Sequence, residues 1–343
     1  MADPSFWAGR RVFVTGHTGF KGTWLCAWLT RMRADVRGYA LAPSTNPNLA
    51  ELIGIESRLD AIRADIRDAS TLQSALSAFA PDVVLHLAAQ ALVRRGYTAP
   101  AETFATNVMG TLHVLEAVRR APSVRVALVV TSDKVYANHE SATPYDEQDP
   151  LGGHDPYSAS KACAELVASC WRRGYALPSI VTARAGNVIG GGDWAPDRLV
   201  PDCMRALAAQ QPISLRSPQA TRPWQHVLDP LNGYLMLAEH VWCAGIGAAE
   251  AWNFGPAPSD IRTVADIVAA LGGCWTPSPC EGPREAGHLA VDSAKAHARL
   301  GWRPRLAIDD ALAWTEAWYR RHREGEDARG LVDEQIARFE ALA

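Results

Sequence analysis

The sequence lacks the features that mark several broad classes of protein. Its seven cysteines are scattered, with no C-x-x-C pair and no histidines at ligand spacing, so neither a disulfide framework nor a metal site is predicted. It has no excess of basic residues, and its net charge of −3 and pI near 6.4 predict no nucleic-acid partner. It also shows no internal repeat and no low-complexity stretch.

Long apolar runs are absent as well. No uninterrupted hydrophobic segment approaches the roughly 20 residues that a membrane-spanning helix needs, and no apolar signal segment precedes the first predicted strand. We therefore expect a cytoplasmic protein with no membrane partner. With 343 residues, 48% of them hydrophobic, the chain can build the core of one large or two small domains.

Buried strands alternate with helical segments through the first half of the chain. Apolar, β-branched runs occupy 12–16, 35–41, 82–88, 125–132 and 179–188. Helical spacing lies between them, for example over 101–120. This alternation predicts an α/β fold, a Rossmann-type doubly wound parallel sheet, and such sheets bind their ligands beyond the carboxyl ends of the strands.

The sequence pattern changes after about Gly190, where Pro-rich, Gly-rich and Trp-rich segments replace the regular alternation of strands and helices. We interpret 189–343 as a smaller C-terminal region that binds the substrate. The run WNFGP at 252–256 is typical of a strand, so a segment near 225–255 is expected to return to the main domain.

A glycine turn joins the first strand to a helix in VFVTGHTGFKG, with glycines at Gly16, Gly19 and Gly22. Glycines let the backbone approach a diphosphate, and a helix N-terminus offers free N–H groups and a positive dipole. At the start of an α/β chain this turn predicts dinucleotide binding, with 1–188 as the NAD-binding domain that carries the catalytic residues. Ala42 stands where an acidic residue would hold the ribose, which leaves NAD and NADP both open, but it offers no positive charge to a 2′-phosphate, so NAD is expected.

Two further motifs carry chemistry. In DPYSASKACAEL, Tyr157 and Lys161 share one face of a helix, and an ammonium beside a phenol favours the phenolate, so Tyr157 can serve as a general base. In VVTSDKVY, a buried strand ends in Thr131, Ser132, Asp133 and Lys134, which places an acid beside a potential base. Simple hydride transfer does not require that pair.

Arginines suited to phosphate follow in the second half of the chain. GNVIGGGDWAPDR supplies Asn187 and Arg198, and TRPWQHV supplies Arg222. Guanidinium groups match the geometry of phosphate oxygens, which predicts a nucleotide diphosphate as part of the substrate.

The order of these motifs resembles that of the extended short-chain dehydrogenase/reductases acting on sugar nucleotides, most of all the branch of the CDP-glucose 4,6-dehydratases. The motifs are GHTGFKG, HLAAQALVRR, TSDKVY, DPYSASK, GNVIGGGDW and RPWQHV, and the resemblance runs from Val12 to about Trp318. It implies an NAD-dependent hydro-lyase that converts CDP-D-glucose to CDP-4-dehydro-6-deoxy-D-glucose. It also implies a homodimer built on the helices at 101–120 and around Tyr157.

The resemblance further implies a role for each motif residue. Tyr157, with Lys161 and Thr131, would take the proton of the sugar 4-hydroxyl while NAD takes the C4 hydride; Lys134 would then remove the C5 proton, Asp133 would protonate the departing 6-hydroxyl, and the hydride would return to C6. The cofactor would be lined by Gly16, Thr18, Gly19, Phe20, Lys21, Gly22, Asp65, Ile66, Ala88 and Asn107, together with Tyr157 and Lys161. The sugar nucleotide would be faced by Gln90, Arg94, Asn187, Arg198 and Arg222.

Two other functions stay open at this point. A sugar-nucleotide 4-epimerase or a decarboxylase on the same scaffold would need Tyr157 and Lys161, but not the Asp133–Lys134 pair. A non-catalytic protein that senses a dinucleotide would need none of these side chains.

Overall fold

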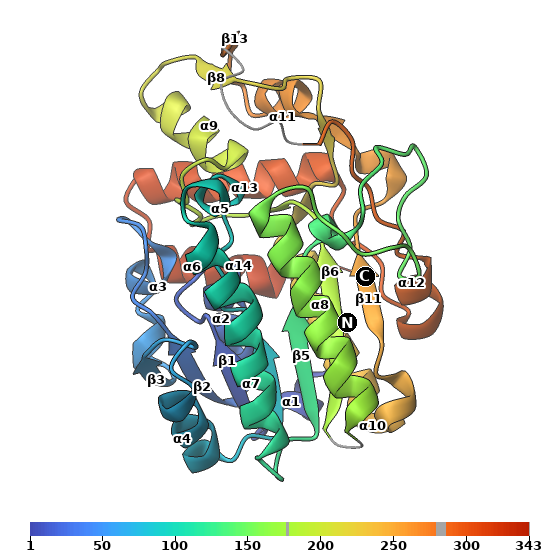
Figure 1. Ribbon diagram of the computed structural model, residues 1–343. Helices are drawn as coiled ribbons and strands as arrows, with labels where there is room; N and C mark the ends of the chain where they lie inside the picture. The colour runs from blue at the N-terminus through green and yellow to red at the C-terminus, as the bar shows by residue number, and fades with distance from the viewer. Residues whose placement is uncertain (176–177, 279–285, 343) are drawn as a thin grey trace.

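The centre of the molecule is a parallel β-sheet (Figure 1). The computed structural model describes residues 1–175, 178–278 and 286–342. Seven strands lie in the order β11-β6-β5-β4-β1-β2-β3, and every neighbouring pair is parallel. The bounds are β1 Arg11–Thr15, β2 Asp35–Ala40, β3 Asp60–Arg63, β4 Val83–His86, β5 Val126–Val130, β6 Ser179–Ala185 and β11 Ala251–Phe254. The predicted doubly wound parallel sheet is confirmed.

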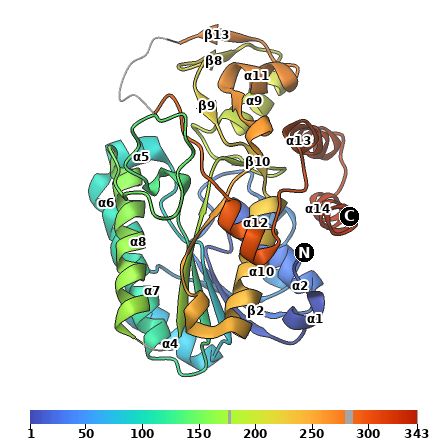
Figure 2. The same ribbon diagram turned by 90° about the vertical axis from the view of Figure 1, so that its right-hand side faces the viewer.

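Helices cover both faces of the sheet, as the side view in Figure 2 shows. One face carries α4 Ala69–Phe79, α5 Val93–Thr98, α6 Pro100–Phe104, α7 Gly110–Arg119 and α8 Pro156–Gly174. The other face carries α1 Pro4–Trp7, α2 Phe20–Arg31, α10 Leu228–Ala244, α12 Ala294–Leu300 and α14 Ala328–Glu340. Two hydrophobic cores result, and Phe13 of β1 packs into one of them while Val12 and Val14 pack into the other.

Most of the remaining elements lie beyond the carboxyl ends of the strands, at the top of Figure 1. They include α9 Leu199–Ala208, α11 Val264–Ala270, α13 Ile308–Arg323 and the short strands β7 Val188–Ile189, β8 Ile213–Leu215, β9 Thr221–Arg222, β10 Gln225–His226, β12 Arg262–Thr263 and β13 Trp275–Pro277. The short strands pair as β10 with β7, β12 with β9 and β13 with β8. The short helix α3 Leu49–Leu52 follows β2 in the chain.

The helix predicted over 101–120 is interrupted. Helix α6 ends at Phe104, a π-helical segment spans Ala105–Met109, and α7 begins at Gly110. Asn107, in the middle of the π segment, accepts from the backbone N–H of Gln90 (2.8 Å) and donates to its carbonyl (3.0 Å). π segments interrupt helices mostly where a side chain has a specific task, and here Asn107 ties the helix to the loop after β4.

The two edges of the sheet differ from the sequence expectation in one respect. β3 was not predicted, because its four residues alternate little and only their middle part is shielded from solvent. At the opposite edge, β11 pairs in parallel with β6, and the carboxylate of Glu147 accepts from the outward backbone N–H of Asn253 at 2.8 Å.

Among the described residues, no helix has the length and apolar character needed to span a membrane.

Candidate active site

The glycine turn between β1 and α2 is tightly closed. Gly16 has φ +79°, and a Cβ there would lie 2.7 Å from the backbone nitrogen of Ala88. A Cβ on Gly22 would lie 2.0 Å from the carbonyl oxygen of Gly16. Both positions therefore require glycine. Gly19 is the N-cap of α2 and provides no side-chain cap, so the first N–H groups of the helix remain available to an anion. This cradle fits the diphosphate of a dinucleotide.

The other predicted cofactor residues surround this turn. Thr18 donates to the carbonyl of Leu41 at 2.9 Å, directly after β2. Phe20 begins α2 and packs against one of the two cores. Beyond β3, Asp65 pairs with Arg67 at 2.8 Å, and this pairing holds the pKa of the Asp65 carboxyl below its usual range. Ile66 is buried there.

Lys21 points into the protein and not toward the outside of the turn. Its ammonium donates to the hydroxyl of Tyr234 at 3.3 Å. Burial lowers the pKa of Lys21 to about 7, and the positive charges of Arg198 and Lys161 act in the same direction. The Lys21 side chain therefore lies in the protein interior, close to the predicted catalytic residue Lys161.

The tyrosine and lysine predicted to be catalytic lie together at the carboxyl end of β5. Lys161 donates to the backbone carbonyl of Val130 at 3.1 Å, and burial lowers the pKa of Lys161 to about 8. Burial raises the pKa of Tyr157, while a hydrogen bond with the side chain of Ser132 lowers it. A positively charged group or a hydrogen-bond donor brought beside the phenol would lower its pKa further.

Thr131 does not take the place expected for it. Its hydroxyl donates to the buried carboxylate of Glu165 at 2.6 Å, about two helical turns beyond Tyr157 on α8. The hydroxyl next to the phenol belongs to Ser132, because consecutive side chains at a strand end point in opposite directions. The sequence reasoning named Ser132 in this motif but gave the catalytic role to Thr131.

The predicted acid and base are adjacent in a 3₁₀ turn over Asp133–Val135. The ammonium of Lys134 lies 3.7 Å from Asp133 Oδ1, which also accepts from the hydroxyl of Ser132 at 2.9 Å. Asp133 is 1% exposed, and its Oδ2 has no hydrogen-bond partner among the described residues. A buried carboxylate oxygen without a partner is costly, so a substrate hydroxyl is the natural group to complete it.

A series of buried hydrogen bonds leads from the end of β1 to helix α8, which carries Tyr157 and Lys161. Thr15, at the end of β1, contacts His86 Nδ1 at 2.6 Å, and His86 Nε2 contacts Thr111 at 3.0 Å. Burial lowers the pKa of His86 to about 3, so the ring is neutral. Asn107 then donates to the hydroxyl of Ser160 at 2.9 Å, one residue before Lys161. In this structure the Asn107 side chain therefore holds the backbone of Gln90 and the hydroxyl of Ser160 in place.

The predicted substrate residues divide into two groups. Arg198 pairs with Asp193 at 3.2 Å. Its positive charge lowers the pKa of Tyr157, which places Arg198 beside the site. Asn187 Oδ1 is buried without a partner among the described residues, and Arg94 pairs with Asp197 at 3.2 Å. Of these three, Asn187 follows the end of β6, Arg94 lies on α5 and Arg198 precedes α9.

Gln90 and Arg222 lie differently. The amide of Gln90 is used internally, since it donates to the carbonyl of Leu92 and accepts from its backbone N–H. Arg222 is buried and donates to the carbonyls of Thr221 (2.8 Å) and Gly287 (3.4 Å). Gln90 therefore has little capacity left for a ligand, whereas Arg222 is held at the C-terminal region.

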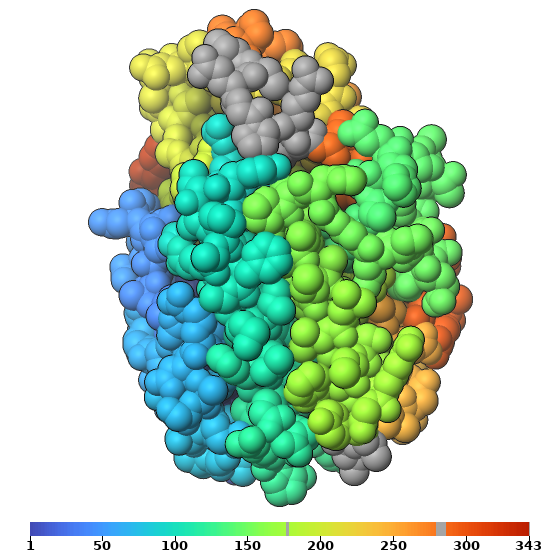
Figure 3. Space-filling view, in the orientation of Figure 1, coloured from blue at the N-terminus to red at the C-terminus, as the bar shows by residue number. Residues whose placement is uncertain are grey.

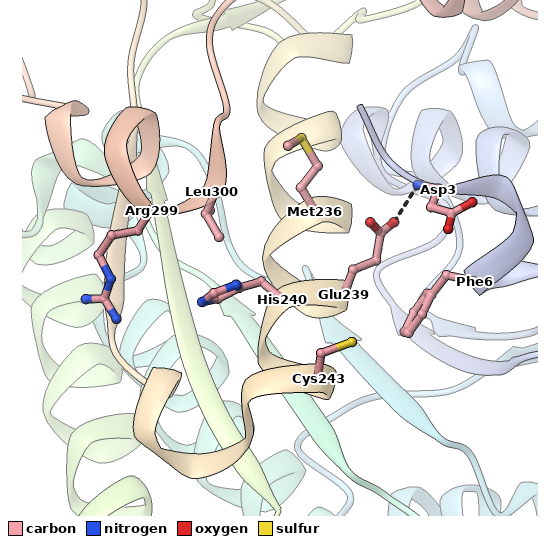
Figure 4. A pocket seen from close by; sticks show the side chains of 8 residues that line it. All are labelled: Asp3, Phe6, Met236, Glu239, His240, Cys243, Arg299 and Leu300. Atoms are coloured by element: carbon pink, nitrogen blue, oxygen red, sulfur yellow. Dashed lines mark hydrogen bonds between the residues drawn. The ribbon is translucent and has the colours of Figure 1, made fainter.

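A cavity of about 320 Å³ lies elsewhere in the molecule, between α1, α10 and α12 (Figure 4). Its lining includes Phe6, Met236, Glu239 and Arg299, and none of the predicted site residues. In the described part of the chain, no three His, Cys, Asp or Glu side chains are grouped as ligands of a metal ion.

Comparisons with known proteins agree with this geometry. Residues 12–254 match the NAD dependent epimerase/dehydratase family. The chain is 45% identical to a CDP-glucose 4,6-dehydratase of Salmonella typhimurium over 95% of both chains, and 27% identical to a probable dTDP-glucose 4,6-dehydratase of Sinorhizobium fredii over 90% of this chain and 92% of that protein. A dTDP-glucose 4,6-dehydratase of Streptomyces venezuelae, solved with NAD bound, superposes with a TM-score of 0.79 at 27% identity, covering 92% of this chain and 98% of that one.

Proposed function

Since the chain belongs to the NAD dependent epimerase/dehydratase family, we propose that it converts CDP-D-glucose into CDP-4-dehydro-6-deoxy-D-glucose and water. The observation that carries dehydration is the Asp133–Lys134 pair beside Tyr157. A 4-epimerase requires only the tyrosine and lysine, so the additional acid and base favour the dehydratase. The similarity to the Salmonella enzyme favours CDP as the nucleotide.

Each side chain of the site has one task in this reaction. Tyr157, assisted by Ser132 and the charge of Lys161, accepts the proton of the sugar 4-hydroxyl. The 4-keto group that results acidifies the hydrogen at C5, and Lys134 removes it as a proton. Asp133 protonates the 6-hydroxyl as its bond to C6 breaks, and water leaves. When bound, NAD supplies a reversible hydride acceptor, which takes the C4 hydride and gives it back at C6, while C5 recovers a proton.

The cofactor would lie along the glycine turn, with Gly16, Gly19 and Gly22 under its diphosphate. Asp65 and Ile66 would border the adenosine, and Tyr157 and Lys161 the nicotinamide end. Arg198, Arg94 and Asn187 would meet the sugar nucleotide close to the reacting carbons. Arg222 would bind it farther along, in the C-terminal region.

We also propose that the protein forms a homodimer through the helices α5 to α8. This face of the molecule is shown in Figure 3, where α7 and α8 run side by side. Large apolar side chains are exposed on this set of helices, namely Tyr97, Phe104, Met109 and Leu166. Exposed side chains of this kind are typical of an interface between protein chains.

The function is tested by offering CDP-, dTDP-, UDP- and GDP-glucose separately to the protein with NAD. We expect CDP-glucose to lose the mass of one water, and we expect no free NADH to accumulate, because the hydride returns to the sugar in each turnover. Stoichiometric release of NADH, or a product of unchanged mass, would contradict the proposal. A clear preference for NADP at equal concentration would contradict the cofactor assignment.

The assignment of Ser132 is tested by comparing three variants at two neighbouring positions. We expect Ser132→Ala to lower kcat by about tenfold to a hundredfold, because the phenol loses its neighbouring hydroxyl, and to leave KM little changed. Ser132→Thr retains a hydroxyl and should recover part of the rate. Thr131→Val should lose less activity than Ser132→Ala. The reverse order would assign the hydroxyl to Thr131, as the sequence first suggested.

A further inference from the structure

A buried ion pair joins the catalytic helix to the sheet. Glu165 lies on α8, four residues after Lys161, and Arg184 lies on β6. Arg184 Nε donates to Glu165 Oε1 and Arg184 Nη2 to Oε2, both at 2.9 Å. The two side chains are 4% and 3% exposed. This two-pronged geometry fixes the relative orientation of both groups and not only their distance.

The carboxylate of Glu165 has no acceptor capacity unused on either oxygen. Thr131 donates to Oε1 at 2.6 Å, and Thr182 donates to Oε2 at 2.8 Å. With the guanidinium bonds, each oxygen accepts two hydrogen bonds. The position of Thr131, immediately before the catalytic turn, is thereby fixed to α8.

The guanidinium fixes the other end of the same turn. Arg184 Nη1 donates to the hydroxyl of Tyr136 at 2.9 Å, and that hydroxyl donates to Asn253 Oδ1 on β11 at 2.7 Å. The Tyr136 ring also stacks on Tyr145, with centroids 5.2 Å apart and planes 14° apart. Tyr136 follows Val135, the last residue of the turn.

Thr131 and Tyr136 therefore bracket Ser132, Asp133 and Lys134, and both are bonded to one ion pair. We propose that Glu165 and Arg184 are positioning residues, which clamp the turn carrying the acid and base against the helix carrying Tyr157 and Lys161. The inference rests on the proposed function, because it assigns these residues to the same reaction. Neither residue is proposed to touch the substrate.

Physical cost supports a positioning role. A buried ion pair contributes little net stability compared with apolar side chains of the same volume, since both charges must be removed from water. Catalysis, by contrast, depends on sub-ångström placement, and a shift of about 1 Å can cost about a hundredfold in rate. The network joins α8, β6 and β11 to the two residues that flank the catalytic turn, Thr131 and Tyr136, so it can hold that placement.

The pair also sets the electrostatic environment of Lys161. The charged or titratable groups that act on or with this ammonium are Glu165 on the same helix, Lys21 on α2 and His86 on β4. Of these, Glu165 raises the pKa of Lys161, against the lowering by burial. Loss of the carboxylate should therefore let Lys161 lose its proton at lower pH.

The first test is Tyr136→Phe, which keeps the ring and the ion pair and removes the bond to one end of the turn. We expect kcat on CDP-glucose to fall about tenfold or more, with KM changed less than about twofold. Amide hydrogen exchange over 131–136 should become faster, which requires no substrate. Tyr145→Phe, the other ring of the stack, serves as the control, because its hydroxyl contacts Asn138 and His139 and not Arg184. Parental kcat and exchange in Tyr136→Phe would overturn the proposal.

The second test is Glu165→Gln, followed by the titration of Lys161 itself. The chain has only four lysines, Lys21, Lys134, Lys161 and Lys295, so their ¹³Cε resonances can be separated and assigned in the full-length protein. We expect the midpoint of Lys161 to move down by about one pH unit, and the alkaline limb of activity to move with it. Glu250→Gln breaks an ion pair with Arg299 elsewhere and should leave Lys161 unchanged. An unmoved midpoint in Glu165→Gln would overturn the effect of Glu165 on Lys161, and parental amide exchange over 131–136 in this variant would overturn the clamp.

The two proposals fail separately. If the parent protein does not dehydrate CDP-glucose, the proposed function is wrong, while the exchange and the Lys161 titration still decide the clamp. If the parent is active and both variants behave like it, the clamp is wrong and the function stands. Should Glu165→Gln fail to fold because Arg184 is left as an unpaired buried charge, Tyr136→Phe decides alone.

Discussion

A Lys134→Met variant given CDP-glucose is expected to reduce its bound NAD and then stall. Tyr157 and Lys161 remain, so the 4-hydroxyl can still be oxidised. Methionine keeps much of the apolar stem of the lysine but cannot accept the C5 proton, and elimination of water is then blocked. Enzyme-bound NADH should accumulate to near the concentration of active sites, with little dehydrated product, as followed by absorbance and by mass spectrometry.

Lys295→Met is the matched control for this experiment. Lys295 lies on α12, and its ammonium pairs with Glu250 and donates to the carbonyl of Ala251 at the amino end of β11, so the Lys295→Met variant should turn over at close to the parental rate. A Lys134→Met variant that dehydrates normally would show that another group takes the C5 proton. One that never forms NADH would place Lys134 in substrate binding or in the first oxidation.

Tyr157→Phe should abolish most activity at an earlier point. The ring still packs, but the acceptor for the 4-hydroxyl proton is gone, and general-base contributions are on the order of 10²–10⁴-fold in rate. Substrate affinity, measured by equilibrium binding, should change little. Unlike Lys134→Met, this variant should form no bound NADH. If it retains more than about a tenth of the parental rate, Tyr157 is not the base.

The central sheet could be predicted because its strands are buried on both faces and read as continuous apolar runs. Strand β3 could not, since its four residues lie at an edge, and an edge strand needs no such run. The π segment at Ala105–Met109 was invisible for a different reason. It depends on the bonds of Asn107 to the backbone of Gln90, which belong to a distant part of the sequence.

The site shows the same division. Tyr157 and Lys161 follow from helix periodicity alone, because residues four apart share a face. The choice between Thr131 and Ser132 depends on which of the two adjacent side chains is bonded to Glu165, and that carboxylate is itself held by Arg184. Gln90 looked available in the sequence, but its amide is used by Leu92 and Thr103. Local spacing predicts which residues carry chemistry, whereas their partners decide which of them reach the substrate.

The Glu147–Asn253 bond also bears on how the chain avoids self-association. An open sheet leaves a row of backbone donors and acceptors on each outer strand, and another chain can add a strand there. On β11 the Glu147 carboxylate occupies the N–H of Asn253. On β3 the ends carry Asp60 and Arg63, which are held in ion pairs with Arg37 and Glu56. Both edges of the sheet are thus poor templates for a further strand, so polymerisation by edge-to-edge pairing is disfavoured. The chain achieves this although its sheet stays open and is not closed into a barrel.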